Sequence, residues 1–212
     1  MDVQTIEYAV SHLGLKVLGG FHGRKSEEPR TTILIGNAGP EMWAAFAEAT
    51  APEARANDAD PLDAWTRRVV DEVAGDLGAQ ALFPFDGPPY HPFQQWAMRS
   101  GQAFASPTGP LIHPMFGLWH AYRGALAFED RLELPSPPKE GSPCLACTEK
   151  PCLNVCPADA FRPEYDVAAC VSHIGSVDGV ACFTSGCLAR RACPVGQQYV
   201  YEDDQLSFHM VR

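Results

Sequence analysis

The sequence lacks an excess of basic residues. Its 212 residues include 16 Lys and Arg against 26 Asp and Glu, which gives a formal net charge of −10 at pH 7. The sequence pI is about 5.1. Nucleic acids and anionic membranes are bound through clustered positive charge, so we expect neither as a partner.

Long hydrophobic runs are also absent. Nowhere do about 18 apolar residues follow one another, as a membrane-spanning helix requires. The opening residues, MDVQTIEYAV, show neither the basic nor the apolar stretch of a secretory signal, so we expect a cytoplasmic protein. No Gly-x-Gly-x-x-Gly, phosphate-binding loop or hydroxyl or thiol nucleophile motif is present, which leaves hydrolase and nucleotide-binding functions without support.

Cysteine is missing from the first 143 residues, whereas all eight cysteines fall between Cys144 and Cys193. This break in composition indicates a domain boundary. The stretch LPSPPKEGS at 134–142 has the Pro and Gly content of an extended connector. We therefore predict a first domain at residues 1–140 and a second domain at 141–212.

Hydrophobic periodicity predicts interleaved helices and strands in the first domain. Apolar residues recur at helical spacing over 3–13 and 62–77, and a short helix is expected at 93–99. The predicted fold class is α+β. Residues with the composition and alternation of strands lie at 15–21, 31–35, 80–85 and 119–128.

The cysteines are arranged in two runs that both end in Cys-Pro. The first run is Cys144-x2-Cys147-x4-Cys152-x3-Cys156-Pro157, and the second is Cys170 followed by Cys182-x4-Cys187-x5-Cys193-Pro194. A [4Fe-4S] cluster needs four converging thiolates, and two-cluster ferredoxins exchange the fourth ligand between runs. We therefore predict that one cluster is held by Cys144, Cys147, Cys152 and Cys193, and the other by Cys170, Cys182, Cys187 and Cys156.

Tetrahedral zinc is the main alternative, because Cys-x2-Cys also suits zinc and the chain has x4 where the simplest ferredoxins have x2. Disulfides are a further alternative, although a reducing cytosol keeps thiols free. Zinc sites do not require Cys-Pro at the end of each run, and two all-cysteine zinc sites rarely interleave, so the spacing favours clusters. Such clusters serve either one-electron transfer or only the stapling of the tail.

The cysteine region, with ELP at 133–135 and AACVSHI at 168–174, resembles the C-terminal part of epoxyqueuosine reductase and reductive dehalogenases. In those families two [4Fe-4S] clusters feed electrons to a cobalamin. The resemblance implies a ferredoxin-like second domain. The substrate domain of the dehalogenases has no counterpart in this short chain.

A second resemblance concerns IHPMFGLWHAYRGALAF at 112–128, which is similar to the His-Pro-Arg-Phe-Gly-Gly-Trp-Phe-Ala-Ile-Arg-Gly motif of CblC-type cobalamin-processing proteins. It implies a flavin-reductase-like, nitroreductase-related α+β fold for the first domain. Met115 and Leu118 depart from the motif, so we expect a difference in the pocket floor or in a phosphate or thiol contact. The matched residues are His113, Pro114, Phe116, Gly117, Trp119, Arg123 and Gly124.

Residues for a corrinoid site follow from this resemblance and from the aromatic and amide side chains that a corrin ring requires. Each has a structural alternative: a loop anchor for His91, a turn for His113, core packing for Phe116 and Trp119, and a carboxylate partner such as Glu129 for Arg123. His173 is expected near the surface or behind the cysteines. The predicted cobalamin-binding residues are Tyr90, His91, Gln94, Trp96, His113, Phe116, Trp119 and Arg123.

These observations lead to one main hypothesis and two rivals. The main hypothesis is an oxidoreductase in which two [4Fe-4S] clusters pass electrons from an external donor, such as a ferredoxin, flavodoxin or reductase, to a bound corrinoid. The rivals are a ferredoxin-type electron carrier with a non-catalytic scaffold domain, and a flavin/iron-sulfur reductase. A homodimer is expected by analogy with related folds.

Overall fold

The computed structural model describes residues 1–24, 28–57, 59–137, 141–162 and 164–211. The chain divides into two compact units, one comprising Met1–Gln102 and His120–Pro138 and the other Ala103–Trp119 and Lys139–Arg212. Residues 103–119 belong to the second unit, so this division is discontinuous in sequence, and the domain boundary after residue 140 stays a prediction. Residues 138–140, beside the predicted boundary, lie outside the described residues.

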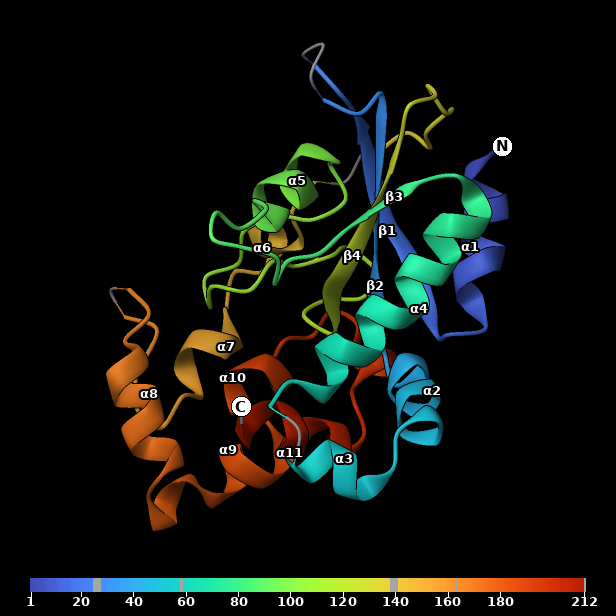
Figure 1. Cartoon of the computed structure of the whole chain (residues 1–212). Helices are drawn as coiled ribbons and strands as arrows, with labels where there is room; N and C mark the ends of the chain where they lie inside the picture. The colour runs from blue at the N-terminus through green and yellow to red at the C-terminus, as the bar shows by residue number, and fades with distance from the viewer. Residues whose placement is uncertain (25–27, 58, 138–140, 163, 212) are drawn as a thin grey trace. The chain divides into compact units, whose positions relative to one another are not determined.

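The first unit is built on a four-stranded antiparallel sheet of strand order β1-β2-β4-β3 (Figure 1). Every residue of the central strand β2 is buried, since it has strands on both edges and is covered on both faces. All four predicted strands are present, and β3 stops at Leu82 shortly before Pro84, which cannot continue a ladder. The strands are β1 (Leu15–His22), β2 (Thr31–Ala38), β3 (Gln80–Leu82) and β4 (His120–Phe128).

Strand β4 carries one irregularity, a bulge at Arg123. Ile35 pairs with Gly124 but the next residue, Gly36, pairs with Tyr122, so Arg123 is an extra residue without a partner in the ladder. Beyond the bulge, the strand is buried on both faces from Gly124 to its end. The alternation of apolar residues in this strand predicts one buried face, whereas the structure buries both faces beyond the bulge.

Three helices of the first unit match the predicted ones: α1 (Val3–Ser11), α4 (Pro61–Leu77) and α5 (Phe93–Arg99). Figure 1 shows α1 and α4 on one side of the sheet and α5 on the other. Helix α1 starts where Asp2 accepts a hydrogen bond from the Thr5 N–H at 2.8 Å, and α4 ends at Gly78 in the left-handed region (φ 65°). Both are standard start and stop signals.

Two helices of the first unit were not predicted, α2 (Glu41–Ala49) and α3 (Pro52–Asn57). Helix α2 is short and buries Phe46 completely, with its ring edge-on to Trp65 of α4 at 5.7 Å between centroids. This contact between residues distant in sequence stabilises α2, so its local sequence pattern alone was too weak to predict it.

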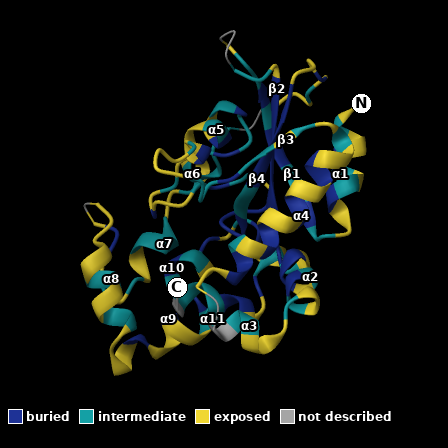
Figure 2. Ribbon diagram, viewed as in Figure 1, coloured by how far each residue is buried: buried dark blue, intermediate teal, exposed yellow. Residues whose placement is uncertain are grey.

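The second unit is a set of short helices without a β-strand among its described residues. Two of them, α6 and α7, begin with Pro143 and Pro151, which favour the first helical position. Helix α11 packs on α9, and α8 has no fully buried residue, as Figure 2 illustrates. The elements are α6 (Pro143–Ala146), α7 (Pro151–Asn154), α8 (Val167–Ile174), η1 (Val177–Gly179), α9 (Val180–Ser185), α10 (Leu188–Arg191), η2 (Gln197–Tyr199) and α11 (Asp203–Val211).

In the described part of the chain, no single helix is long and apolar enough to cross a membrane. One helix pair, Val167–Ile174 with Val177–Ser185, reaches the required length and composition only when taken together, and it is bent by 95°.

Candidate functional site

A first cavity in the second unit is lined by Cys144, Cys147, Cys152 and Cys193. Three of these cysteines come from the segment of α6 and α7, and the fourth, Cys193, follows α10 some forty residues later. We call this space the first cysteine cavity. Its cysteines are the four that the sequence assigned to one cluster.

Burial and nearby hydrogen-bond donors act in opposite directions on the thiols of the first cysteine cavity. Burial raises the pKa of the Cys144 and Cys193 thiols. The Val195 N–H points at the Cys193 sulfur and opposes that rise. The Lys150 ammonium also lines the cavity and donates to the carbonyl oxygens of Cys144 and Cys147 at 2.9 and 3.3 Å. Positive charge and N–H groups therefore lie where thiolates need compensation.

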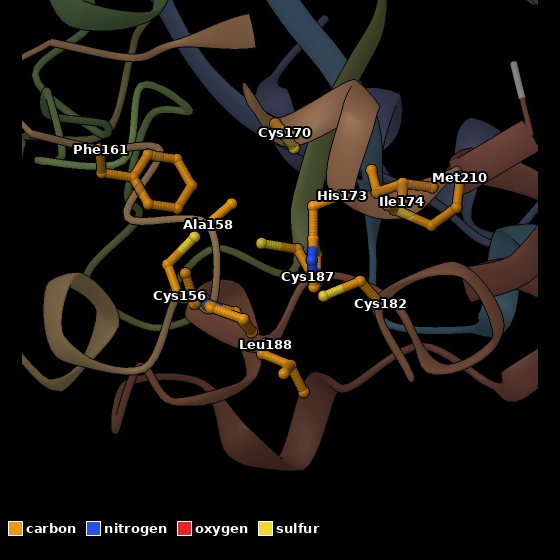
Figure 3. A pocket seen from close by; sticks show the side chains of 12 residues that line it. Cys156, Ala158, Phe161, Cys170, His173, Ile174, Cys182, Cys187, Leu188 and Met210 are labelled. Atoms are coloured by element: carbon orange, nitrogen blue, oxygen red, sulfur yellow. The ribbon is translucent and has the colours of Figure 1, made fainter. Parts of the chain in front are cut away.

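A second cavity, the second cysteine cavity, is lined by Cys156, Cys170, Cys182 and Cys187. Figure 3 shows these thiols directed toward a common space, together with apolar side chains such as Phe161 and Ile174. Burial raises the pKa of the Cys187 thiol, while the N–H groups that follow it in α10 oppose the rise. The remaining wall is mostly apolar.

His173, which sequence reasoning placed near the surface or behind the cysteines, lines the second cysteine cavity. Its Nε2 atom is buried and has no hydrogen-bond partner among the described residues. Figure 3 shows the His173 side chain among the labelled residues that line this cavity. A buried polar nitrogen without a partner is costly, so a group that fills this cavity and accepts a hydrogen bond would remove that cost.

The grouping of the eight cysteines matches the interleaved sets expected from spacing. Cys156, the last cysteine of the first run, lies with the second set, and Cys193, the last of the second run, lies with the first set. All eight are free thiols. Among the residues that the structure describes, no group of three or more His, Cys, Asp or Glu side chains is arranged to hold a metal ion.

The HPMFG turn at 113–117 supports the loop that carries Cys193. His113 pairs with Gly117 in a short bridge, and a Cβ on Gly117 (φ 58°) would lie 2.0 Å from the Val195 carbonyl oxygen. Conversely, a Cβ on Gly196 would lie 2.4 Å from the Phe116 carbonyl. Only glycine permits this close approach of two backbones.

Two predicted cobalamin ligands form part of this turn. His113 Nδ1 accepts hydrogen bonds from the Met115 and Phe116 N–H groups at 3.1 and 3.3 Å, and burial lowers the His113 pKa to about 4. The Phe116 ring stacks on His113 and meets Tyr199 edge-on, with centroids 4.4 and 4.9 Å apart. The structure thus gives both residues a role in shaping the turn.

Trp119 and Arg123 have structural partners as well. Trp119 is completely buried against Tyr201, so none of its surface is exposed to a ligand. Arg123 donates from Nε to Asn37 Oδ1 at 3.2 Å and lies 3.8 Å from the Asp63 carboxylate. Asp63 of α4 is thus a carboxylate beside Arg123 that sequence proximity did not suggest.

The other predicted cobalamin ligands form a partly exposed group in the first unit, at the loop before α5 and along that helix. Tyr90 is 64% exposed, and Gln94 is also exposed. The His91 ring lies 5.3 Å from the Trp96 ring, whose other neighbours are aromatic too. Aromatic faces and an amide are therefore accessible here, as a corrin ring requires.

Sequence reasoning missed three residues beside the cysteines: Lys150, Tyr165 and Arg190. The Tyr165 hydroxyl bonds to the Cys170 thiol, which with burial raises the Tyr165 pKa to about 12. Lys150 and Arg190 lie within three residues of a cysteine, and that proximity was the available signal.

We compared the chain with protein families, curated proteins and solved structures. No family model and no curated protein matches the chain. Among solved structures, the B12-trafficking protein CblC of C. elegans, described as a human MMACHC homologue, is similar at 17% identity with a TM-score of 0.60. The match covers 98% of this chain and 89% of that chain. The chain has a CblC-like fold.

The CblC-like fold can be compared with each of the two predicted domains. The expected likeness of the first part to CblC is confirmed at the level of the fold. Since the match covers 98% of the chain, the likeness also extends into the cysteine region. The comparison identifies no ferredoxin-like domain there, so that assignment stays a prediction.

Proposed function

We propose that this protein is a cobalamin-binding iron-sulfur redox protein, in which two [4Fe-4S] clusters pass electrons to a bound corrinoid. The observation that carries the proposal is the presence of two separate cavities, each lined by four free cysteines. Thiolates are the ligands of such clusters. The sets also follow the exchange of the last cysteine between runs that the spacing predicted.

The residues around each cavity fit a cluster chemically. The backbone N–H groups near Cys187 and Cys193, and the Lys150 ammonium, would compensate the negative charge of a bound cluster and its thiolates. The unpartnered Nε2 of His173 would find an acceptor in a cluster sulfur. When bound, the clusters would supply one-electron transfer, with potentials set by these hydrogen bonds and by burial.

The corrinoid part of the proposal is supported by the CblC-like fold and by the exposed aromatic and amide side chains around α5. The C. elegans protein of this fold is a B12-trafficking protein. Tyr90, His91, Gln94 and Trp96 would hold the corrinoid through aromatic faces and hydrogen bonds to its amides. The cobalt chemistry belongs to the corrinoid, and the protein would bind and orient it.

The test is an anaerobic titration of the iron-loaded protein with hydroxocobalamin, followed by dithionite. Saturation at one corrinoid per chain, with faster cobalt reduction than in a Cys144→Ser/Cys170→Ser protein that lacks both clusters, is the expected result. His91→Ala should weaken corrinoid binding, whereas His12→Ala, an exposed histidine of the same unit, should not. An unperturbed corrin spectrum would remove the corrinoid from the proposal.

A second candidate, an electron carrier without a corrinoid, is favoured by one observation. Trp119 is fully buried and Arg123 is engaged by Asn37 and Asp63, so two of the expected corrinoid ligands already have structural partners. This candidate predicts reversible cluster reduction without any effect of hydroxocobalamin. If the isolated protein is yellow and releases FMN on extraction, the flavin/iron-sulfur alternative takes precedence.

A further inference from the structure

A third cavity lies beside the second cysteine cavity, within the second unit, and has a volume of about 360 Å³. Its apolar wall includes Leu118, Phe161 and Val171, and its polar groups include Arg190 and His209. Ligand pockets for small molecules range from about 300 to 1,000 Å³. The space therefore suits a compact organic molecule and is too small for a corrinoid.

The cavity reaches the second cysteine set directly. Cys170 and Cys187 line both this cavity and the second cysteine cavity. A molecule in the third cavity would therefore contact two of the four thiols that are proposed to hold a cluster. Tyr165, which bonds to Cys170, lines the same space.

Arg190 is held rigidly at the wall of this cavity. Its Nε donates to the Leu118 carbonyl oxygen at 2.8 Å, and the guanidinium lies 4.4 Å over the Trp119 ring and 4.5 Å from the Tyr201 ring. These contacts occupy the flat face of the guanidinium and its Nε edge. Among the described residues, its two terminal nitrogens have no hydrogen-bond acceptor.

Apart from the two cysteines, the charged side chain that lines the cavity is positive. Arg190 is the permanently charged residue among the described lining residues, and no Asp or Glu is among them. This contrasts with a chain whose formal net charge is −10. A preorganised guanidinium with free N–H donors recognises a carboxylate or a similar planar anion.

We propose that this cavity binds a small organic anion with a flat apolar body. Its anionic group pairs with the terminal nitrogens of Arg190, and its body lies against Phe161, Cys170 and Cys187. The inference rests on the proposed function only for one part, the contact between this ligand and a cluster. Binding itself depends on the cavity and on Arg190.

The experiment uses 2-naphthoate as an anionic probe and 2-naphthalenemethanol as its neutral counterpart, titrated calorimetrically under anaerobic conditions into the full chain. A charge-assisted hydrogen bond contributes about 1.5–3 kcal/mol, so the anion should bind at least tenfold more tightly than the alcohol. Arg190→Gln should remove that preference and Arg190→Lys should keep part of it. Arg191→Gln is the matched control, because that exposed arginine bonds to the Ser185 carbonyl and lines none of the three cavities.

Arg190→Gln also removes a cation packed on Trp119 and Tyr201, so a second variant guards against loss of folding. Val171 lines the cavity but is 62% exposed, and Val171→Trp should fill the space without disturbing the core. It should weaken both probes. Equal binding by wild type, Arg190→Gln and Val171→Trp, or no binding of naphthoate at millimolar concentration, would overturn the proposal.

Iron and sulfide content, measured on the same samples, separates this inference from the proposed function. If clusters are absent, the proposed function fails while calorimetry still decides the binding of the anion. If clusters are present, naphthoate should shift the electron paramagnetic resonance signal of one reduced cluster in wild type but not in Val171→Trp. An unchanged signal with saturated probe would overturn the contact between ligand and cluster.

Discussion

At the level of single residues, the buried Nε2 of His173 favours an occupant of the second cysteine cavity that accepts a hydrogen bond. This nitrogen is buried and unpartnered among the described residues, and the side chain lines the second cysteine cavity. A hydrogen bond to sulfur stabilises the more negative, reduced state of a cluster and so raises its potential.

His173→Phe should therefore lower the potential of the second cluster by on the order of 60 mV, which corresponds to a tenfold change in a one-electron equilibrium. His173→Gln, which keeps an N–H donor, should recover most of the loss. A redox titration followed by electron paramagnetic resonance measures both. Equal potentials in wild type and His173→Phe would show that Nε2 does not bond to the cluster.

His113 gives a pH dependence of folding. Burial lowers its pKa from 6.5 to about 4 in the folded protein, so the unfolded chain takes up a proton first as the pH falls. The folded state therefore loses stability between pH 6.5 and 4, by on the order of 1 kcal/mol once solvent exposure is allowed for.

His113→Asn keeps an acceptor for the Met115 and Phe116 N–H groups and removes the titration. Urea unfolding at pH 7 and pH 4.5 should show a smaller loss of stability for this variant than for wild type. The same loss in both proteins would mean that other groups cause it.

At the level of elements, the HPMFG turn and the Cys193 loop are joined through two glycines. Gly117→Ala should destabilise the second unit by at least about 2 kcal/mol, because it combines a left-handed backbone with a Cβ 2.0 Å from the Val195 carbonyl oxygen. Gly141→Ala is the control, since Gly141 has a similar φ of 67° and nothing within 4 Å. Thermal unfolding and iron retention measure the difference, and equal effects of both substitutions would leave only backbone strain as the cause.

The same turn explains why part of the CblC-like motif could be recognised but not interpreted from sequence. The sequence analysis named His113 and Phe116 as candidate ligands and Gly117 as a matched residue of the motif. In the structure their contacts are with each other, with Tyr199 and with the loop around Val195. A single sequence does not distinguish residues that shape a turn from residues that contact a ligand.

At the level of the whole molecule, the interleaving of the two cysteine runs predicts which cysteine variants lose the same cluster. Cys193→Ser should remove the same cluster as Cys144→Ser, and Cys156→Ser should remove the other. Each variant should lower the iron content from about eight to about four atoms per chain, as two [4Fe-4S] clusters require.

Iron analysis and electron paramagnetic resonance of the reduced single and double variants test this pairing. Cys144→Ser/Cys193→Ser should resemble either single variant, whereas Cys144→Ser/Cys156→Ser should hold almost no iron. If each cluster instead used cysteines from one run, Cys193→Ser would give the same spectrum as Cys187→Ser.

The elements with strong local signals could be predicted from the amino-acid sequence. Helices α1, α4 and α5 and the four strands follow from apolar periodicity, and Pro61 marks the start of α4. Cysteine spacing predicted both sets of four, because close cysteines must share a loop and one distant cysteine must close each set.

The residues that pack beside those elements became known only from the three-dimensional fold. It placed α2 on Trp65, joined residues 103–119 to the cysteine unit, and fixed Arg123 at a bulge beside Asp63. It also set His173 among the thiols and Arg190 at the wall of a cavity. These outcomes depend on contacts between residues far apart in the chain, and such contacts leave no periodicity in the sequence for a pattern to reveal.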